Sequence, residues 1–208
     1  MKERLLIIFI ALMYAIGLLA HLFFPTLPWM LRLTPFVLFM LGLIALFPVI
    51  QEKQPKIWLW CIFTYLFTFF LEVIGLATGG IFGPYIYGDT LGFQLWGVPA
   101  VIGFNWLLVI LGSVNFANQL VKHTLLSTFL VGVLTVVFDY VMEPIAVKLN
   151  YWRWYTAFIP VENYIAWFLV AFFTAGIYNW GKLKIHTKLP MMYFLIQFLF
   201  FLFLRFLL

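Results

Sequence analysis

Charged side chains are scarce in this sequence of 208 residues: they make up 9% of it, while hydrophobic residues make up 66% and the mean hydropathy is +1.10. So little polar surface excludes an ordinary water-soluble domain. In lipid, only helices and closed barrels satisfy their own backbone hydrogen bonds, and the apolar runs here are continuous rather than alternating. The sequence therefore predicts an all-α, polytopic transmembrane helix bundle that forms one domain over residues 1–208.

Cysteine and histidine are also rare, which limits the chemistry. The single cysteine, Cys61, excludes an intrachain disulfide and a cysteine metal cluster, and we expect it to pack between helices. The three histidines, His21, His123 and His186, are far apart and have no ligand spacing. Gly-rich phosphate loops and nucleophile elbows are absent as well. We therefore expect no metal and no cofactor.

Seven apolar runs are long enough to cross about 30 Å of hydrocarbon as helices. The first is interpreted as a retained span rather than a signal peptide, because no small-residue cleavage site follows it. The expected spans are Leu5–Phe23, Leu33–Ile50, Ile57–Leu76, Val98–Ala117, Thr124–Met142, Glu162–Trp180 and Leu189–Leu207.

The distribution of basic residues predicts the orientation. With seven spans, eight Lys and Arg residues fall on the side of the N-terminus and four on the other side, namely Arg32, Lys148, Arg153 and Arg205. The positive-inside rule then places the N-terminus in the cytoplasm of a multi-pass protein of the cell membrane. Topology and anionic lipid headgroups account for the net charge of +5, so no nucleic-acid partner is expected.

Only seven residues are acidic, and a carboxylate at membrane depth is costly unless it is paired, hydrated or protonated. Glu3 and Glu52 lie beside basic residues and are interpreted as solvated surface charges. The other five map to the outer side once the helix directions are assigned. They are Glu72, Asp89, Asp139, Glu143 and Glu162.

Asp139 and Glu143 are four residues apart and therefore share one helical face. Two carboxyl groups in an apolar setting do not both ionise cheaply, so one is expected to keep its proton and to be a candidate general acid. The alternative interpretation is a structural pair neutralised by Lys148 or Arg153.

The loops beside these acids are rich in glycine and aromatic residues. Residues 77–97 contain six glycines together with Phe82, Tyr85 and Tyr87, so we expect an irregular segment that lies at the membrane interface or folds back into the bundle, and we interpret it as a lid. Residues 151–155 read Tyr-Trp-Arg-Trp-Tyr, which indicates either an interfacial aromatic belt or the wall of a pocket that stabilises a positive charge. Asn105 and Asn163 are expected to orient water or a carboxyl group, or else to join helices.

These motifs resemble those of the small polytopic carotenoid-biosynthesis hydratases, which include acyclic carotenoid 1,2-hydratases and bisanhydrobacterioruberin hydratases. The resemblance covers roughly residues 72–180, and Ile81, Asn150 and Ala166 depart from the family pattern. The first part of the signature is Glu72-x-x-Gly75-x-x-x-Gly79, Phe82-Gly83-x-Tyr85-x-Tyr87, Gly97-Val98-Pro99 and Trp106. The second part is Asp139-x-x-x-Glu143-Pro144-x-Ala146, Tyr151-Trp152-x-Trp154, Pro160-x-x-Asn163-Tyr164 and Trp167.

The resemblance implies cofactor-independent hydration of the terminal isopropylidene double bond of an acyclic carotenoid, with a polyene substrate, water and membrane lipid as partners. It suggests Asp139 as the proton donor and Glu143 or Glu72 as the residue that positions water. The rings of Tyr85, Tyr87, Trp152 and Trp154 are expected to stabilise the carbocation. Asn105, Trp106, Asn163 and Trp167 complete the predicted substrate-binding set.

Three other functions stay open on the sequence alone. A carotenoid end-group cyclase begins with the same protonation, but a nearby double bond captures the cation. A proton-coupled transporter also uses intramembrane carboxylates, although here they gather near one face and no inverted repeat is found. A non-catalytic membrane subunit or pigment-binding protein is the third alternative.

Overall fold

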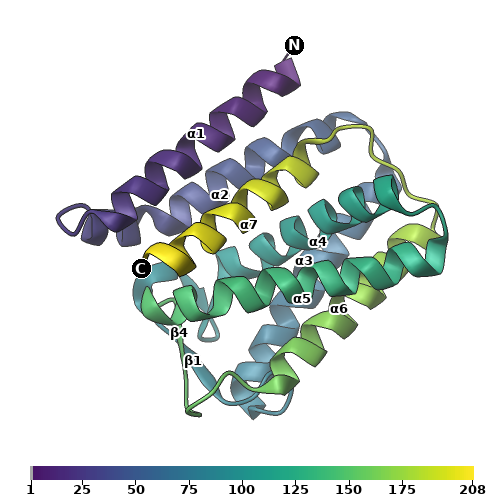
Figure 1. Ribbon diagram of the computed structural model, residues 1–208. Helices are drawn as coiled ribbons and strands as arrows, with labels where there is room; N and C mark the ends of the chain where they lie inside the picture. The colour runs from purple at the N-terminus through teal and green to yellow at the C-terminus, as the bar shows by residue number, and fades with distance from the viewer. Residues whose placement is uncertain (1) are drawn as a thin grey trace.

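The computed structural model describes residues 2–208, and within this range it contains seven long helices (Figure 1). Each of the seven is long and apolar enough to cross a membrane. The predicted all-α, polytopic helix bundle is therefore confirmed. The helices are α1 (Lys2–Leu22), α2 (Leu27–Gln51), α3 (Pro55–Thr78), α4 (Ala100–Leu120), α5 (Thr124–Lys148), α6 (Val161–Trp180) and α7 (Leu189–Leu207).

Two helices extend six residues beyond one end of the predicted apolar run. Helix α2 begins at Leu27 instead of Leu33, because Pro28 is tolerated in the first turn, where its missing N–H has no intrahelical partner to lose. Helix α5 continues past Met142 to Lys148, with Pro144 inside it. Pro144 leaves the carbonyl of Tyr140 without its usual helical donor, and the guanidinium of Arg205 donates to this carbonyl instead at 2.5 Å.

Helix α4 is the centre of the bundle. Of its 21 residues, 16 are buried, and it packs against α2, α3, α5, α6 and α7. Its approach to α7 depends on a glycine, since a Cβ at Gly112 would lie 2.5 Å from the carbonyl oxygen of Pro190. These five helices thus surround α4 and shield it from lipid.

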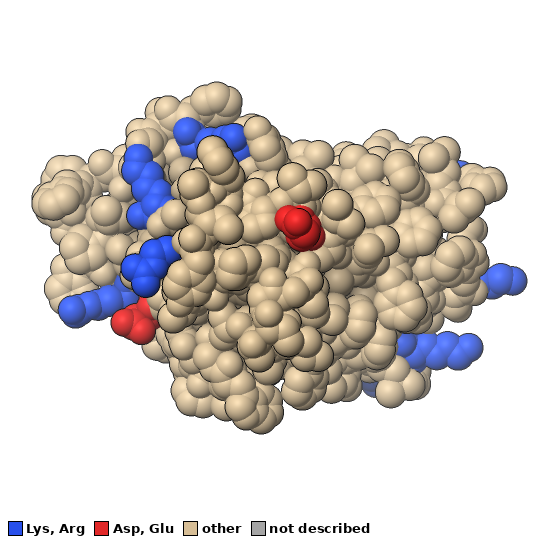
Figure 2. Space-filling view, turned by 90° about the horizontal axis from the view of Figure 1, so that it is seen from below, with Lys and Arg blue, Asp and Glu red and all other residues tan. Residues whose placement is uncertain are grey.

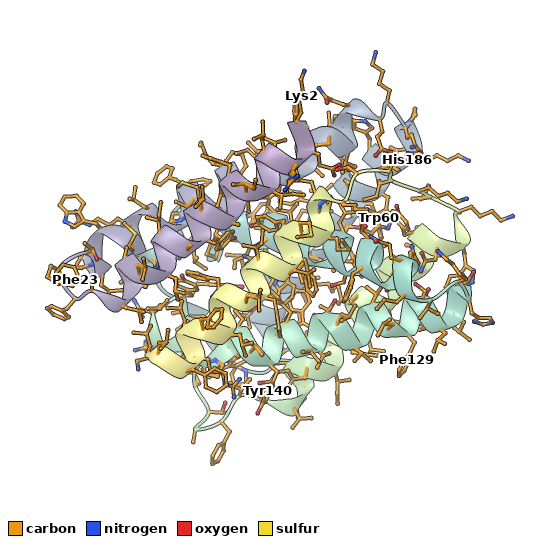
Figure 3. The ribbon with its side chains drawn as sticks, turned by 45° about the horizontal axis from the view of Figure 1, so that its top comes forward. Lys2, Phe23, Trp60, Phe129, Tyr140 and His186 are labelled. Atoms are coloured by element: carbon orange, nitrogen blue, oxygen red, sulfur yellow. The ribbon has the colours of Figure 1, made fainter. Side chains whose placement is uncertain are left out.

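The seven helices run up and down between two ends of different character. One end, which we call the lysine end, holds the start of α1 and the loops 52–54, 121–123 and 181–188. His186 and Lys2 lie at this end in Figure 3, and Phe23 and Tyr140 lie toward the other end. Figure 2 shows Lys and Arg gathered toward two opposite ends, with a surface between them that is almost free of charge apart from one acidic side chain. This pattern suits a bundle with lipid around its middle.

The end opposite the lysine end carries short strands, which the prediction of an irregular segment over residues 77–97 did not include. The strands are β1 (Tyr85–Tyr87), β2 (Gln94–Leu95), β3 (Val98–Pro99) and β4 (Trp152–Trp154), and a 3₁₀ turn covers Asp89–Leu91. Strand β1 pairs antiparallel with β4, and β2 pairs with β3. The partner of β1 lies far along the chain, so the local sequence gives no sign of the pairing. Val98 and Pro99 belong to β3, so α4 begins at Ala100 rather than at Val98.

Candidate active site

Three carboxyl groups come together beneath the small sheet of β1 and β4. Glu72 comes from α3, and Asp139 and Glu143 come from one face of α5. Their exposed fractions are 4%, 0% and 2%, so all three are buried. Asp89 and Glu162, which the sequence placed on the same side, are exposed instead. The structure thus separates three buried acids from two exposed ones.

No basic side chain neutralises the buried acids. Within residues 2–208, the single salt bridge closer than 4.0 Å joins Glu52 to His186 at the lysine end. The ammonium of Lys148 donates instead to the main-chain carbonyl of Leu208, and Arg153 is exposed. The structure therefore does not contain the alternative, a structural ion pair with Lys148 or Arg153. Uncharged donors hold the carboxyl groups.

Glu143 has the most hydrogen-bond donors of the three. Its Oε2 accepts from the indole Nε1 of Trp152 at 3.0 Å and of Trp154 at 2.9 Å. Its Oε1 faces the Nδ2 of Asn163 at 3.4 Å. Three N–H groups on one buried carboxyl group provide the partners that an ionised carboxylate requires away from water.

Asn163 also joins Glu143 to Asp139. Its Nδ2 donates to the Oδ2 of Asp139 at 2.6 Å, whereas the Oδ1 of Asp139 is buried without a hydrogen-bond partner. Asn163 lies in the first turn of α6, so this amide couples α6 to α5 at the level of the acids. The contact with carboxyl groups and the joining of helices, the two uses that the sequence left open for Asn163, therefore occur together.

The nearest hydrogen-bond donor to Glu72 is a hydroxyl group. The Oη of Tyr85, at the start of β1, donates to Glu72 Oε2 in a short hydrogen bond. Burial, together with the nearby carboxyl group of Glu72, raises the pKa of Tyr85 above its ordinary value. Tyr85 therefore keeps its proton at neutral pH and stays a donor.

The pairing of β1 with β4 explains why four aromatic rings face the acids. Side chains alternate across a strand, and the register sets Tyr85 opposite Trp154 and Tyr87 opposite Trp152. The ring centroids of these pairs are 5.1 Å and 5.9 Å apart. The alternate residues, Ile86 and Arg153, are exposed. The two strands thus form an aromatic cover over the carboxyl groups, which we call the cover sheet.

A stack of three rings forms another wall of the site. Trp106 of α4 stacks on Trp167 of α6 with centroids 3.6 Å apart, and Phe82 also stacks on Trp167, at 5.0 Å. Phe82 was not in the predicted substrate-binding set, although it belongs to the Phe-Gly motif quoted for the resemblance. All three rings are almost completely buried.

The acids and rings enclose a cavity of about 20 Å³. This is enough space for one water molecule, which also needs two to four polar partners. Two predicted residues do not line the cavity. Asp139 accepts a hydrogen bond from Asn163, which does line the cavity, and Asn105 accepts a hydrogen bond from Gln197 at 2.8 Å, joining α4 to α7. The lining residues are Glu72, Phe82, Tyr85, Tyr87, Trp106, Glu143, Trp152, Trp154, Asn163 and Trp167.

Comparisons with known proteins identify the family of this chain. The model of the family described as "carotenoid biosynthesis protein" matches residues 33–208. A curated relative, the bisanhydrobacterioruberin hydratase of Haloarcula japonica, is 25% identical over 169 residues. The match covers 74% of this chain and 54% of the relative, so it spans about half the relative's length. No solved structure matches significantly. Because the family match extends over most of the sequence, this chain belongs to the carotenoid biosynthesis protein family.

Proposed function

We propose that this protein adds water to the terminal isopropylidene double bond of an acyclic carotenoid end group. The observation that carries the proposal is the buried group of carboxyl side chains around a water-sized cavity with aromatic walls. Membership of a carotenoid biosynthesis family and the similarity to a protein named as a hydratase support it.

The reaction needs only an acid, a base and water. A carboxylic acid gives its proton to one alkene carbon, and the π electrons form the new C–H bond, which leaves a tertiary carbocation. The oxygen of water then bonds to the cation and loses a proton to a carboxylate. The sum is the addition of H and OH, and a proton moved between the two carboxyl groups restores the starting state.

Glu143 is the proposed base. Its three N–H donors compensate a negative charge that would otherwise be very costly in this setting. An ionised Glu143 can accept a hydrogen bond from a water molecule in the cavity and take the proton that this water releases.

Glu72 is the proposed proton donor, because it is the second carboxyl group that lines the cavity and it comes from a different helix, α3. Asp139 is then a positioning residue that acts through Asn163. This assignment differs from the sequence-based one, in which Asp139 is the acid, because Asp139 does not line the cavity.

The aromatic walls are proposed to stabilise the carbocation. Ring faces attract a positive charge when it lies within about 6 Å of the centroid, and unlike a carboxylate they do not form a bond to it. Tyr85 and Trp154 of the cover sheet and the stacked rings of Trp106 and Trp167 line the cavity together.

The substrate is proposed to reach the acids from the bilayer when the cover sheet moves. An isopropylidene group does not fit into about 20 Å³, so β1 and β4 must move apart or away from α5 before the alkene reaches Glu72. The excess of basic residues supports a cytoplasmic location for the lysine end. The cover sheet then lies at the opposite face of the membrane, where water is available.

Product analysis tests the proposed function. The protein is expressed in a host that accumulates lycopene, and the extracted pigments are examined by chromatography and mass spectrometry. An acyclic pigment that has gained the mass of water supports the hydratase. A cyclised product of unchanged mass would instead show a cyclase, and unmodified lycopene with membranes in which the protein is present would contradict an enzyme acting on this end group.

The indole N–H groups offer a narrower prediction. Trp154→Phe keeps an aromatic ring but removes one donor to Glu143, so we expect the hydration rate to fall about 10- to 100-fold, the range for a lost hydrogen bond to a charged group. The initial rate is measured in membranes with equal amounts of protein. Trp96→Phe is the matched control, because Trp96 is 68% exposed at the same end. An unchanged rate in Trp154→Phe would contradict the role given to Glu143.

A further inference from the structure

A second, larger cavity lies at the lysine end, away from the carboxyl groups. Its volume is about 710 Å³, and it is bounded by the ends of α4 and α6, the start of α5 and the loop 181–188. Four lysines line it, and no aspartate or glutamate does; with neutral histidine the lining thus carries four positive charges. The lysines are Lys122, Lys182, Lys184 and Lys188.

Amide side chains line the interior of this cavity, and hydrogen bonds fix their positions. The Nδ2 of Asn118 donates to Asn179 Oδ1 at 2.9 Å, and the Nε2 of Gln119 donates to Asn115 Oδ1 at 2.8 Å. Asn118 and Asn179 are also bonded to hydroxyl groups of α5. Apolar side chains of Val121, Leu183 and Ile185 complete the wall. The cavity therefore offers cations and amides together with an apolar wall.

The acidic residues of the lysine end do not neutralise these lysines. Glu52 accepts hydrogen bonds from the main-chain N–H of His186 at 2.7 Å and from its ring Nδ1 at 3.1 Å. Glu3 accepts from the main-chain N–H of Lys188 at 2.6 Å. Within residues 2–208, no lysine ammonium lies within 4.0 Å of an aspartate or glutamate carboxylate. The positive charge of the lining is thus left for a ligand or for solvent; lysine side chains extend outward near His186 in Figure 3.

We propose that this cavity binds a phosphate group, either of an anionic phospholipid or of a soluble phosphate ester or diphosphate. Lysine ammonium groups bind phosphate oxygens as point charges, and amide N–H groups add donors of fixed direction. The apolar wall accommodates the carbon chain next to a lipid phosphate. This site is independent of the hydratase proposal, because it lies at the other end of the bundle and shares no residue with the acid site.

Binding to the purified full chain in detergent tests the proposal. Native mass spectrometry measures phosphatidylglycerol against phosphatidylcholine, and calorimetry measures inorganic pyrophosphate. We expect at least about tenfold tighter binding of phosphatidylglycerol or pyrophosphate to the wild type than to Lys182→Gln/Lys184→Gln. Lys53→Gln/Lys56→Gln is the matched control, since it removes the same charge from the lysine end outside the cavity. Each pair includes one lysine with φ near +50° (Lys53 φ 51°, Lys182 φ 54°), so the backbone requirements are similar.

The outcomes separate the possible ligands. Tight binding of phosphatidylglycerol alone assigns the cavity to a lipid headgroup, and tight binding of pyrophosphate alone assigns it to a soluble phosphate. An equal loss of binding in both double variants would show general attraction to a basic surface and overturn the proposal. Equal binding of phosphatidylcholine and phosphatidylglycerol, with no binding of pyrophosphate, would overturn it as well. Thermal unfolding of each variant shows whether the fold is unchanged.

Discussion

Glu72→Gln and Glu143→Gln are each expected to lower the rate of carotenoid hydration by about 10²- to 10⁴-fold, the usual contribution of a general acid or base. Glutamine has nearly the same shape as glutamate, but its amide does not give a proton to an alkene or take one from water. Both side chains line the cavity. Within residues 2–208 neither forms a salt bridge, so the substitution leaves no basic side chain without its partner. The measurement is the initial rate of product formation in membranes, at equal protein content.

The matched controls for this prediction come from the same end of the bundle. Glu162→Gln removes an exposed acid and is expected to leave the rate unchanged. Asp139→Asn keeps a side chain that can bond to Asn163, and it is expected to lower the rate by less than Glu72→Gln does. If Asp139→Asn lost as much activity as Glu72→Gln, or more, the proton donor would be Asp139. Near wild-type rates in both glutamine variants would contradict acid–base chemistry at this site.

Spans are readable from the sequence because the length and hydrophobicity needed to cross a bilayer are local properties of the chain. The positions at which the helices begin and end depend less on local sequence. Nothing near Pro144 indicates that α5 continues, because the group that compensates the lost helical hydrogen bond is Arg205, on a different helix. The predicted start of α2 is too late for another reason: Arg32 interrupts the apolar sequence just before Leu33, although it lies inside the helix.

The convergence of the acids followed from helix direction and from the four-residue spacing of Asp139 and Glu143. Their donors were harder to assign, because the indole contacts to Glu143 depend on the pairing of β1 with β4. Asn105 was expected at the site, but its partner Gln197 lies on α7, at a position that the sequence does not connect to it. Helix periodicity thus predicts which residues share a face, and it does not predict which helix that face meets.

The cover sheet leads to the second large effect that we expect. Gly88 lies where the two loops that carry β1 and β4 meet, and its N–H donates to the carbonyl of Tyr151 at 2.9 Å. A Cβ at this position would lie 2.2 Å from the main-chain oxygen of Asn150. Gly88→Ala must therefore displace one loop from the other. We expect the hydration rate to fall by about 10²-fold or more, the effect of a displacement of about 1 Å on a catalytic arrangement.

Gly80→Ala is the matched control, because it lies in the same loop and the nearest atom to its Cβ, the Oγ1 of Thr78, would be 3.5 Å away. The rate of this variant should equal that of the wild type. Circular dichroism and gel filtration of Gly88→Ala should show an intact bundle, since none of the seven helices contains Gly88. If a folded Gly88→Ala kept the full rate, the cover sheet would not need this close contact, and the indole donors would not have to be held against Glu143 for turnover. Loss of activity with the helices intact would instead show that turnover requires close packing of the cover sheet against the acids.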